Sequence, residues 1–277
     1  MIKCLNLGCG QRFHPEWVNL DLHPSNPSVQ RWDVHEELPF PSGSFDVVYH
    51  SHVLEHLSKQ DAPLFLRECY RVLRSGGVIR VAVPDLEKIA RLYLEALEKA
   101  SQGIPGWAEN YEWMLLEMYD QTVRERSFGA FEEYCGQDPI PNWEFVYGRG
   151  GAEAKAIREW IRGRRHERPA APPMSRLSYA LRNPAKFLNH KILKVLLSKE
   201  DYEALQIGRF RRQGEIHQWM YDGYSLARLL QATGFRNTKR SEATQSQIPN
   251  WAQYCLDSEI DGTPYKPDSI YMEAVKS

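Results

Sequence analysis

The sequence predicts an α/β fold in which a mostly parallel sheet is interrupted by a long helical insertion. In residues 1–85, short apolar runs rich in β-branched residues alternate with polar turns or with a helical pattern, as they do in successive βαβ units. From residue 86 to residue 213 the pattern changes to long helical stretches with many aromatic residues, and strand-like runs return in residues 214–277. We therefore predict one core built from the two outer segments and a helical insertion or cap, residues 86–213, between them.

Seven strands are predicted. They lie near Cys4–Leu7, Val18–Leu22, Val29–Val34, Phe45–His50, Val78–Val83, Arg236–Ser241 and Ser269–Val275. The last two are expected to form an antiparallel pair at the edge of an otherwise parallel sheet, which would give a seven-stranded sheet with an antiparallel last strand.

Apolar residues at helical spacing predict the helices. Asp61–Leu73 has this pattern, and Ser75-Gly76-Gly77 is expected to end it as a C-terminal cap. Further helices are expected over Leu86–Ala100, Tyr111–Arg126 and Tyr224–Thr233. The Pro-rich segment Arg168–Pro173 is expected to be a flexible joint inside the insertion.

Composition is that of a soluble globular protein, with 42% apolar and 26% charged residues in 277 positions. A formal charge of -1 gives no overall field that would attract nucleic acid. The five cysteines are scattered and form no CxxC pair, so we expect neither a disulfide framework nor a bound metal. Without a long apolar run or a signal peptide, the protein is expected to be cytoplasmic.

The strongest local signal is a strand that ends in Gly8-Cys9-Gly10. Glycine tolerates positive φ and lets a backbone approach a ligand closely, although a simple turn after a strand would also explain the pattern. The next strand ends in Asp21, where a carboxylate can accept two hydrogen bonds from ribose hydroxyls. A third strand ends in Asp33-Val34.

Four segments taken together carry a family resemblance: LNLGCG, NLDL, WDV with LPFPSGSFDVVYHSHVLEH, and RVLRSGGVIRVAVPD. They resemble the class I S-adenosylmethionine-dependent methyltransferases, and most closely the type 11-like, small-molecule and sugar-modifying branch. The resemblance covers the first 85 residues well and the last 60 loosely, and it does not cover the insertion. It implies a Rossmann-like sheet, S-adenosylmethionine as cofactor and methyl transfer as activity.

The resemblance also implies a cofactor site, made of Asn6, Gly8, Cys9, Gly10, Asp21, Leu22, Asp33, Val34, Ser51 and His52. Its glycine turn, Gly8 to Gly10, would pass under the methionine part of the cofactor, and Asp21 would hold the ribose. Many relatives carry an acid where this chain has Asn6, so the contact to the cofactor amine would keep its hydrogen bond and lose its charge.

The adenine end would be held by the second and third strands. Leu22 would pack on the ring face, Asp33 would accept a hydrogen bond from the amino group, and the Val34 backbone would contact the ring edge. His50-Ser51-His52, at the end of the fourth strand, would line the methionyl and sulfonium region.

Only 11 positions separate Gly10 from Asp21, fewer than a parallel crossover with a helix usually needs. The first crossover helix is therefore expected to be truncated or absent. Without its N-terminus beside the methionine carboxylate, Arg12 is a candidate for the missing positive charge.

Candidate catalytic residues are His52 after the fourth strand, Asp85 after the fifth, and His217 in the segment that returns from the insertion. A histidine suits the removal of a hydroxyl proton near neutral pH. Glu55 and His56 are further candidates, and a role in capping or packing is favoured for both.

We expect the methyl acceptor to be a hydroxyl of a small molecule or of a saccharide or glycan intermediate. Residues 162–199 are rich in Lys and Arg, which suggests a solvated basic face or a contact to an anionic substrate or a membrane surface. Nothing in the sequence indicates an oligomeric state.

Three rival functions are less well supported. A protein that keeps the fold without turnover would be a binding or scaffold protein, and Asn6 together with the short first crossover favours it. An NAD-dependent oxidoreductase would need G-x-G-x-x-G, which Gln11-Arg12-Phe13 does not supply. A nucleic-acid methyltransferase is disfavoured by the near-neutral charge and by the lack of the motifs for a flipped base.

Overall fold

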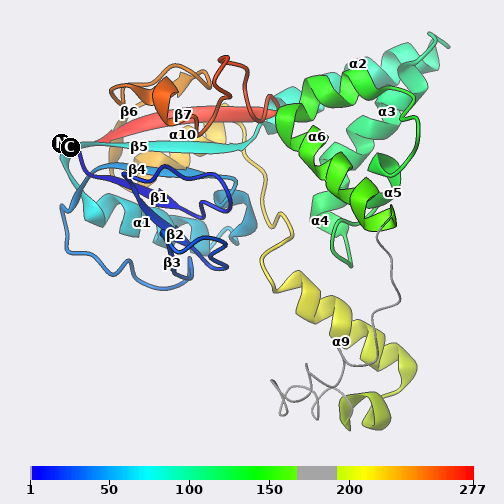
Figure 1. Ribbon diagram of the computed structural model, residues 1–277, viewed down its shortest axis with the longest axis horizontal. Helices are drawn as coiled ribbons and strands as arrows, with labels where there is room; N and C mark the ends of the chain where they lie inside the picture. Colours follow the sequence, from blue (N-terminus) through cyan, green and yellow to red (C-terminus); the bar gives the residue numbers. More distant parts are fainter. Residues whose placement is uncertain (1, 167–191) are drawn as a thin grey trace.

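The computed structural model describes residues 2–166 and 192–277, in which a sheet with flanking helices lies beside a group of helices (Figure 1). The sheet contains β1 (Cys4–Leu7), β2 (Val18–Asp21), β3 (Val29–Arg31), β4 (Phe45–Ser51), β5 (Leu73–Pro84), β6 (Phe235–Ser241) and β7 (Ser269–Lys276). Each of these strands overlaps a predicted one. Segment 168–173, predicted to be a joint, and most of the basic stretch 162–199 lie outside the described residues.

The strand order is β3-β2-β1-β4-β5-β7-β6. Strands β1 to β5 pair in parallel, whereas β7 runs antiparallel to both β5 and β6. The predicted fold class, a mostly parallel seven-stranded Rossmann-like sheet with an antiparallel last strand and added helices, is confirmed. The last strand is inserted between β5 and β6, so β6 forms the edge.

One predicted cap is wrong. Helix α1 (Asp61–Val72) ends before the glycines, at the extended residue Leu73, and Ser75-Gly76-Gly77 belongs to β5. Phe45 pairs with Leu73 but Val47 pairs with Val78, so β5 bulges outward between these two pairs. Positive φ at Gly76 therefore serves a bulge in a strand and not the end of a helix.

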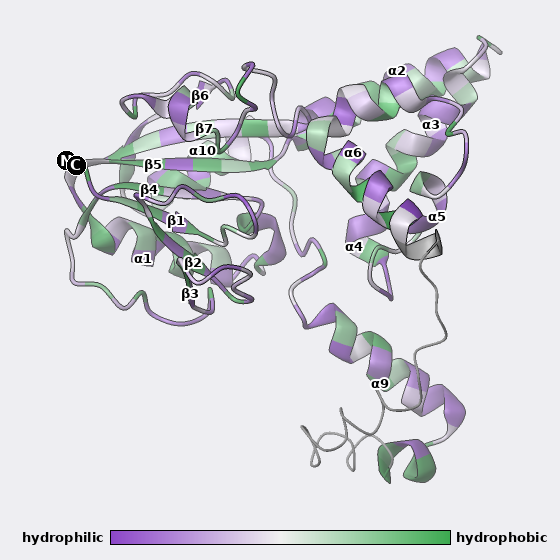
Figure 2. Ribbon diagram, viewed as in Figure 1, coloured by the Kyte–Doolittle hydropathy of each residue, from purple (hydrophilic) through white to green (hydrophobic). Residues whose placement is uncertain are grey.

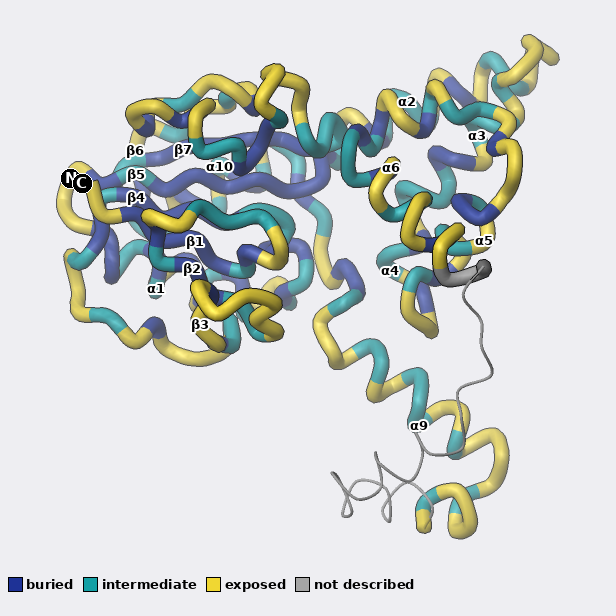
Figure 3. Tube along the Cα trace, viewed as in Figure 1, coloured by how far each residue is buried: buried dark blue, intermediate teal, exposed yellow. Residues whose placement is uncertain are grey.

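The main core lies between one face of the sheet and helices α1 and α10 (Gly223–Ala232). Buried apolar side chains from alternating strand positions meet the apolar faces of both helices there. They include Leu5, Leu7, Val48, Ile79, Phe65, Leu66, Leu226 and Leu230. Figure 3 shows the central strands as the most continuously buried part of the chain.

No helix lies between β1 and β2 in residues 8–17, as the spacing predicted. The sheet face that such a helix would cover is covered instead by the connection between β6 and β7. That connection contains the 3-10 helix η3 (Trp251–Tyr254), and its Trp251 and Leu256 pack on Trp17 and Tyr49.

The side chain of Arg80 in β5 holds this connection against the sheet. Its side chain is fully buried, pairs with Asp257 and Glu273 at 2.7 Å each, and donates to the carbonyl oxygens of Glu242 and Gln245. Its guanidinium also lies 4.4 Å from the ring centroid of Trp251. One cation thus holds the start and the middle of a long loop against the sheet.

The insertion has an apolar core of its own. The helices of the insertion are α2 (Leu86–Ser101), α3 (Trp107–Leu115), the π-helix η2 (Leu116–Asp120), α4 (Gln121–Val123), α5 (Phe131–Cys135) and α6 (Trp143–His166), with α9 (Lys199–Arg211) after the undescribed segment. Polar and apolar residues alternate along α2, and its apolar side packs into this core (Figure 2). Trp113 is buried there, whereas Tyr147 and Trp160 are exposed. The division of the chain at residues 85 and 213 stays a prediction.

Helix α6 meets the sheet part at Gly151. This residue has a φ of 58°, and a Cβ there would lie 2.6 Å from both Pro267 Cδ and Tyr265 O. Glycine is required at this point because both the backbone conformation and the close approach exclude a side chain. The approach brings α6 against the segment that precedes β7.

No helix among the described residues is long and apolar enough to cross a membrane.

Replacing Arg80 with Met should destabilise the fold strongly, because it leaves the carboxylates of Asp257 and Glu273 buried without their partner. Breaking a buried pair in this way costs about 3–5 kcal/mol, measured as the loss in free energy of unfolding by urea. Arg74→Met is the matched control on the same strand. Arg74 pairs with Asp46 at the surface, where such a pair contributes about 0–1 kcal/mol, and equal losses in the two variants would contradict the anchoring role of Arg80.

Candidate active site

Two cavities lie side by side at the carboxyl ends of β1, β4 and β5. The β1–β4 cavity, of about 400 Å³, is lined by the glycine turn, the end of β4 and the segment before β7. The insertion cavity, of about 460 Å³, lies between that edge of the sheet and helices of the insertion. In open α/β sheets ligands bind at this edge.

Six of the ten predicted cofactor residues line the β1–β4 cavity: Asn6, Gly8, Cys9, Gly10, Ser51 and His52. Gly8 has a φ of 63°, and a Cβ there would lie 2.3 Å from Val53 Cγ2. The N–H groups of Gly8 and Cys9 both donate to Leu20 O, at 2.8 and 3.2 Å. The turn is therefore fixed against β2 and carries no side chain at Gly8.

Asp21 lies directly beside this turn, at the end of β2. Its Oδ2 accepts from the Gly10 N–H at 2.8 Å, and its Oδ1 accepts from the His23 N–H at 2.8 Å. Both carboxylate oxygens have further lone pairs, so the group can also accept from hydroxyls of a bound ligand.

The predicted adenine contacts lie further along the sheet edge and do not line either cavity. Asp33 Oδ1 accepts from the His35 N–H at 3.0 Å. Val34 packs against the main core, and Leu22 is half-buried next to Asp21. The cofactor roles of Leu22, Asp33 and Val34 stay predictions.

Asn6 points its amide into the wall of the β1–β4 cavity. Its Nδ2 donates to Arg12 O at 3.2 Å and to Asn19 Oδ1 at 3.3 Å. Its Oδ1 is buried and has no hydrogen-bond partner among the described residues. A buried acceptor without a donor is costly, and it suits a ligand that brings an N–H group.

Arg12 also lines this cavity, but its donors are used within the protein. They reach the carbonyl oxygens of Cys255, Leu256 and Ser258, and Nη1 pairs with Glu259 at 2.9 Å. Arg12 therefore holds the connection between β6 and β7 against the glycine turn, and its role as a substitute charge stays a prediction.

Three residues line both cavities, namely His52, Glu153 and Lys266. Glu153 of α6 and Lys266 of the segment before β7 form an ion pair at 2.8 Å. His52 follows β4 with a φ of 54°, and such a backbone is strained for a residue other than glycine and is often found at functional sites. The three side chains form the border between the two cavities.

Two neighbours orient the His52 ring. Nδ1 lies 3.0 Å from Glu55 Oε1, and Nε2 lies 2.8 Å from Ser269 Oγ. A carboxylate beside Nδ1 favours the proton on that nitrogen, which leaves Nε2 as an acceptor at the border of the cavities.

Glu55 is fully buried on the short helix η1 (Leu54–His56). Burial raises the pKa of Glu55, but the interaction with the His52 ring, whose Nδ1 lies 3.0 Å away, lowers it by more, so the net pKa lies below the usual value. Glu55 is therefore a buried carboxylate.

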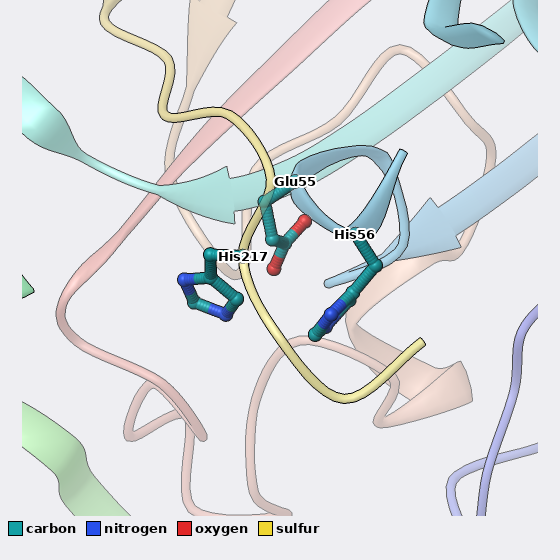
Figure 4. A group of neighbouring side chains, drawn as sticks. All are labelled: Glu55, His56 and His217. Atoms are coloured by element: carbon teal, nitrogen blue, oxygen red, sulfur yellow. The ribbon is translucent and has the colours of Figure 1, made fainter. Parts of the chain in front are cut away.

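His217 lines the insertion cavity beside His56, with ring centroids 4.9 Å apart (Figure 4). Burial lowers the pKa of His217 to about 3, so its ring is neutral at neutral pH. The structure thus brings two of the three predicted catalytic residues, His52 and His217, to the same cavity.

Asp85 lies elsewhere. It is buried and caps α2 by accepting from the Lys88 N–H at 3.3 Å, and it pairs with Arg240 at 2.5 Å. Asp85 lines neither of these two cavities, and its catalytic role stays a prediction.

The chain is similar to known methyltransferases over its first third. A family model for a methyltransferase domain matches residues 5–81. A protein of Mycolicibacterium smegmatis described as a probable S-adenosylmethionine-dependent methyltransferase is 51% identical over 49 residues, which are 18% of each chain. The ubiquinone/menaquinone biosynthesis C-methyltransferase UbiE of Vibrio cholerae is 32% identical over 105 residues, 35% of this chain and 40% of that one.

This chain therefore spans less than half the length of these two relatives. Among solved structures, an S-adenosylmethionine-dependent methyltransferase from Archaeoglobus fulgidus is 13% identical, with 99% of this chain and 86% of that chain covered, at a TM-score of 0.39. This weak likeness adds nothing to the identification.

Residues 5–81 thus match a methyltransferase domain, as the sequence motifs indicated, and the cofactor is S-adenosylmethionine. The β1–β4 cavity fits this cofactor. The unpartnered Asn6 Oδ1 can accept a hydrogen bond from the amino group of the cofactor. The Asp21 carboxylate, beside the glycine turn, can accept hydrogen bonds from the ribose hydroxyls. Gly8 has no side chain that would keep the cofactor away from the backbone.

Sequence reasoning missed Glu153, Tyr265 and Lys266. Glu153 lies within the insertion, and the other two lie in an irregular segment, about 140 and 250 residues after the glycine turn. No local pattern marks them, because only the tertiary fold brings them to the β1–β4 cavity.

Replacing Asp21 with Ala should weaken binding of S-adenosylmethionine and S-adenosylhomocysteine at least about tenfold, because a hydrogen bond to a charged group contributes about 1.5–3 kcal/mol. Titration calorimetry measures this change. Asn26→Ala is the matched control, because Asn26 Oδ1 accepts from the N–H two residues ahead, as Asp21 does. Similar cofactor affinities of the two variants would contradict the assignment of Asp21 to the cofactor site.

Proposed function

We propose that this protein transfers a methyl group from S-adenosylmethionine to a hydroxyl of a small molecule or saccharide bound in the insertion cavity. One observation carries the proposal: the cofactor cavity and the insertion cavity share a border made of His52, Glu153 and Lys266. Methyl transfer needs donor and acceptor aligned at close range, and adjoining cavities supply that arrangement.

S-adenosylmethionine supplies an electrophilic methyl group on a sulfonium. The protein positions the cofactor and the acceptor and excludes water from them. Apolar side chains of the insertion, including Ile89, Leu116, Phe128 and Met220, line the acceptor cavity and keep water from the acceptor. His52 Nε2 accepts a hydrogen bond from the acceptor hydroxyl in place of Ser269 and so orients its oxygen.

The charges in the insertion cavity favour a neutral, polar acceptor. Five carboxylates and three cations line it. Each cation is already paired: Arg149 with Glu117, Arg124 with Asp120 and Glu215, and Lys266 with Glu153. The carboxylates outnumber the cations and so disfavour an anionic acceptor, whereas a hydroxyl can bond to many of these groups, including Arg124 Nε and Arg149 Nη1, which have no hydrogen-bond partner among the described residues.

The names of the matched relatives do not settle the methylated atom. UbiE is a C-methyltransferase, and another relative, 29% identical over 98 residues, is the ajmaline N-methyltransferase of Rauvolfia serpentina. We infer O-methylation from His52, which presents a nitrogen acceptor to the cavity. The alternative, a binding or scaffold protein without turnover, predicts cofactor binding and no product.

The activity can be tested by measuring release of S-adenosylhomocysteine with a panel of monosaccharides, disaccharides and phenols. His52→Asn should lower turnover at least about 100-fold, because misplacement of a reacting group by about 1 Å has that effect. Asparagine accepts the left-handed backbone of this position, and titration of the variant with S-adenosylhomocysteine shows whether its cofactor cavity is intact.

His35→Asn, on an exposed loop, is the control and should leave turnover unchanged. Wild-type protein that binds the cofactor but releases no product with any acceptor of the panel would favour the scaffold alternative. Full turnover by His52→Asn would remove His52 from the proposal.

A further inference from the structure

We propose that Glu55, His56 and His217 form a binding site for a divalent transition-metal ion at the wall of the insertion cavity (Figure 4). One carboxylate oxygen and one nitrogen of each imidazole lie within 4.8 Å of one another. Imidazole and carboxylate are the ligands that Zn²⁺ takes in many protein sites.

Backbone hydrogen bonds bring the three residues together before any ion binds. Glu55 and His56 lie on η1, and His217 lies on the segment that returns from the insertion. The N–H of Gln218 donates to Glu55 O at 2.7 Å, and its side-chain Nε2 donates to His56 O at 2.7 Å. The N–H of His217 donates to Gln121 O at 2.9 Å. The site is therefore built from two segments that are fixed against each other.

The His56 ring is set in the tautomer that a metal needs. Its Nδ1 lies 3.1 Å from Ile216 O, and a carbonyl oxygen can only accept, so Nδ1 carries the proton. Nε2 is left with its lone pair. A hydrogen bond from the second ring nitrogen to a carbonyl is the usual way in which proteins orient a metal-binding histidine.

The second observation is the Glu55 carboxylate itself. It is fully buried, and its one close polar contact is His52 Nδ1, at 3.0 Å from Oε1. Oε2 has no hydrogen-bond partner among the described residues. Carboxylate oxygens offer about four lone-pair sites, and a buried anion with most of them unused is costly unless a cation accompanies it.

Figure 4 shows this carboxylate between the two imidazole rings, where an ion would meet all three side chains. Metal bonds of about 2.0–2.2 Å require the three ligand atoms to approach one another by small side-chain rotations. The nearest cations, Lys266 and Arg124, are each paired with carboxylates, so they offset little of the attraction.

Two histidines and one carboxylate are a ligand set that suits Zn²⁺, Co²⁺, Fe²⁺ or Mn²⁺ and does not suit Ca²⁺ or Mg²⁺, which prefer oxygen. Three protein ligands leave at least one coordination position open. Because His56 and His217 both line the insertion cavity, the open position faces the space where the acceptor would lie. The ion site itself does not depend on methyl transfer.

The test uses the full chain, stripped of metal with a chelator and carrying Cys255→Ser, because Cys255 is the one described cysteine that is not buried. Calorimetric titration with Zn²⁺ should show one site. Titration with Co²⁺ should produce visible absorption bands of a low-symmetry, four- or five-coordinate ion. His217→Ala and Glu55→Gln should each weaken Zn²⁺ binding at least about tenfold, as loss of even an outer-shell partner does.

His35→Ala is the control for unspecific binding to an exposed histidine, and it should bind Zn²⁺ like the parent protein. Glu55→Gln keeps the side-chain volume, and circular dichroism with S-adenosylhomocysteine binding reports whether each variant is folded. Absence of Zn²⁺ and Co²⁺ binding to folded parent protein, or equal binding by folded His217→Ala, would overturn the site. Because cofactor binding and product release are measured separately, that outcome leaves the proposed methyl transfer standing.

Discussion

The short link between β1 and β2 is the constraint on which the rest of the structure depends. Residues 8–17 join two parallel neighbours without a helix, so one face of the sheet lacks the cover that a crossover helix normally gives. The connection between β6 and β7 covers it instead. Its aromatic and aliphatic side chains pack on Trp17 and Tyr49, and the buried Arg80 fixes it to β5 and β7.

The use of the β6–β7 connection in place of a crossover helix also shapes the site. The connection that covers the sheet also passes the glycine turn, where Arg12 binds three of its carbonyl oxygens. It then supplies Tyr265 and Lys266 to the β1–β4 cavity and meets Gly151 of α6 at close range. A segment needed for packing thus also joins the β1–β4 cavity to the insertion. The buried pair at Arg80 stabilises the loop, and the loop positions the border residues.

The sequence was sufficient to predict what depends on local pattern. All seven strands were found because apolar, β-branched runs are bounded by turns, and six residues of the cofactor cavity were found because they lie in two short motifs. The missing crossover helix followed from spacing alone.

What sequence reasoning missed depends on tertiary structure. Ser75-Gly76-Gly77 has the composition of a helix cap, but pairing with β4 extends β5 through it as a bulge. Asp85 follows β5 at the expected position, and only the structure shows that it also caps α2. Glu153 and Lys266 come from distant segments. For Glu55 the sequence predicts a role in capping or packing, and nothing in its surroundings in the sequence shows that its carboxylate is buried near histidines.

The buried Glu55 links the two chemical features of the site. One of its oxygens lies beside His52, which faces both cavities, and the carboxylate also stands between His56 and His217 (Figure 4). Through Gln218 and Ile216 the same short helix holds the segment that returns from the insertion. A shift of the insertion that moved this segment would therefore change the surroundings of Glu55, and through Glu55 the orientation of His52. The geometry at the border of the two cavities therefore depends on the position of the segment that returns from the insertion.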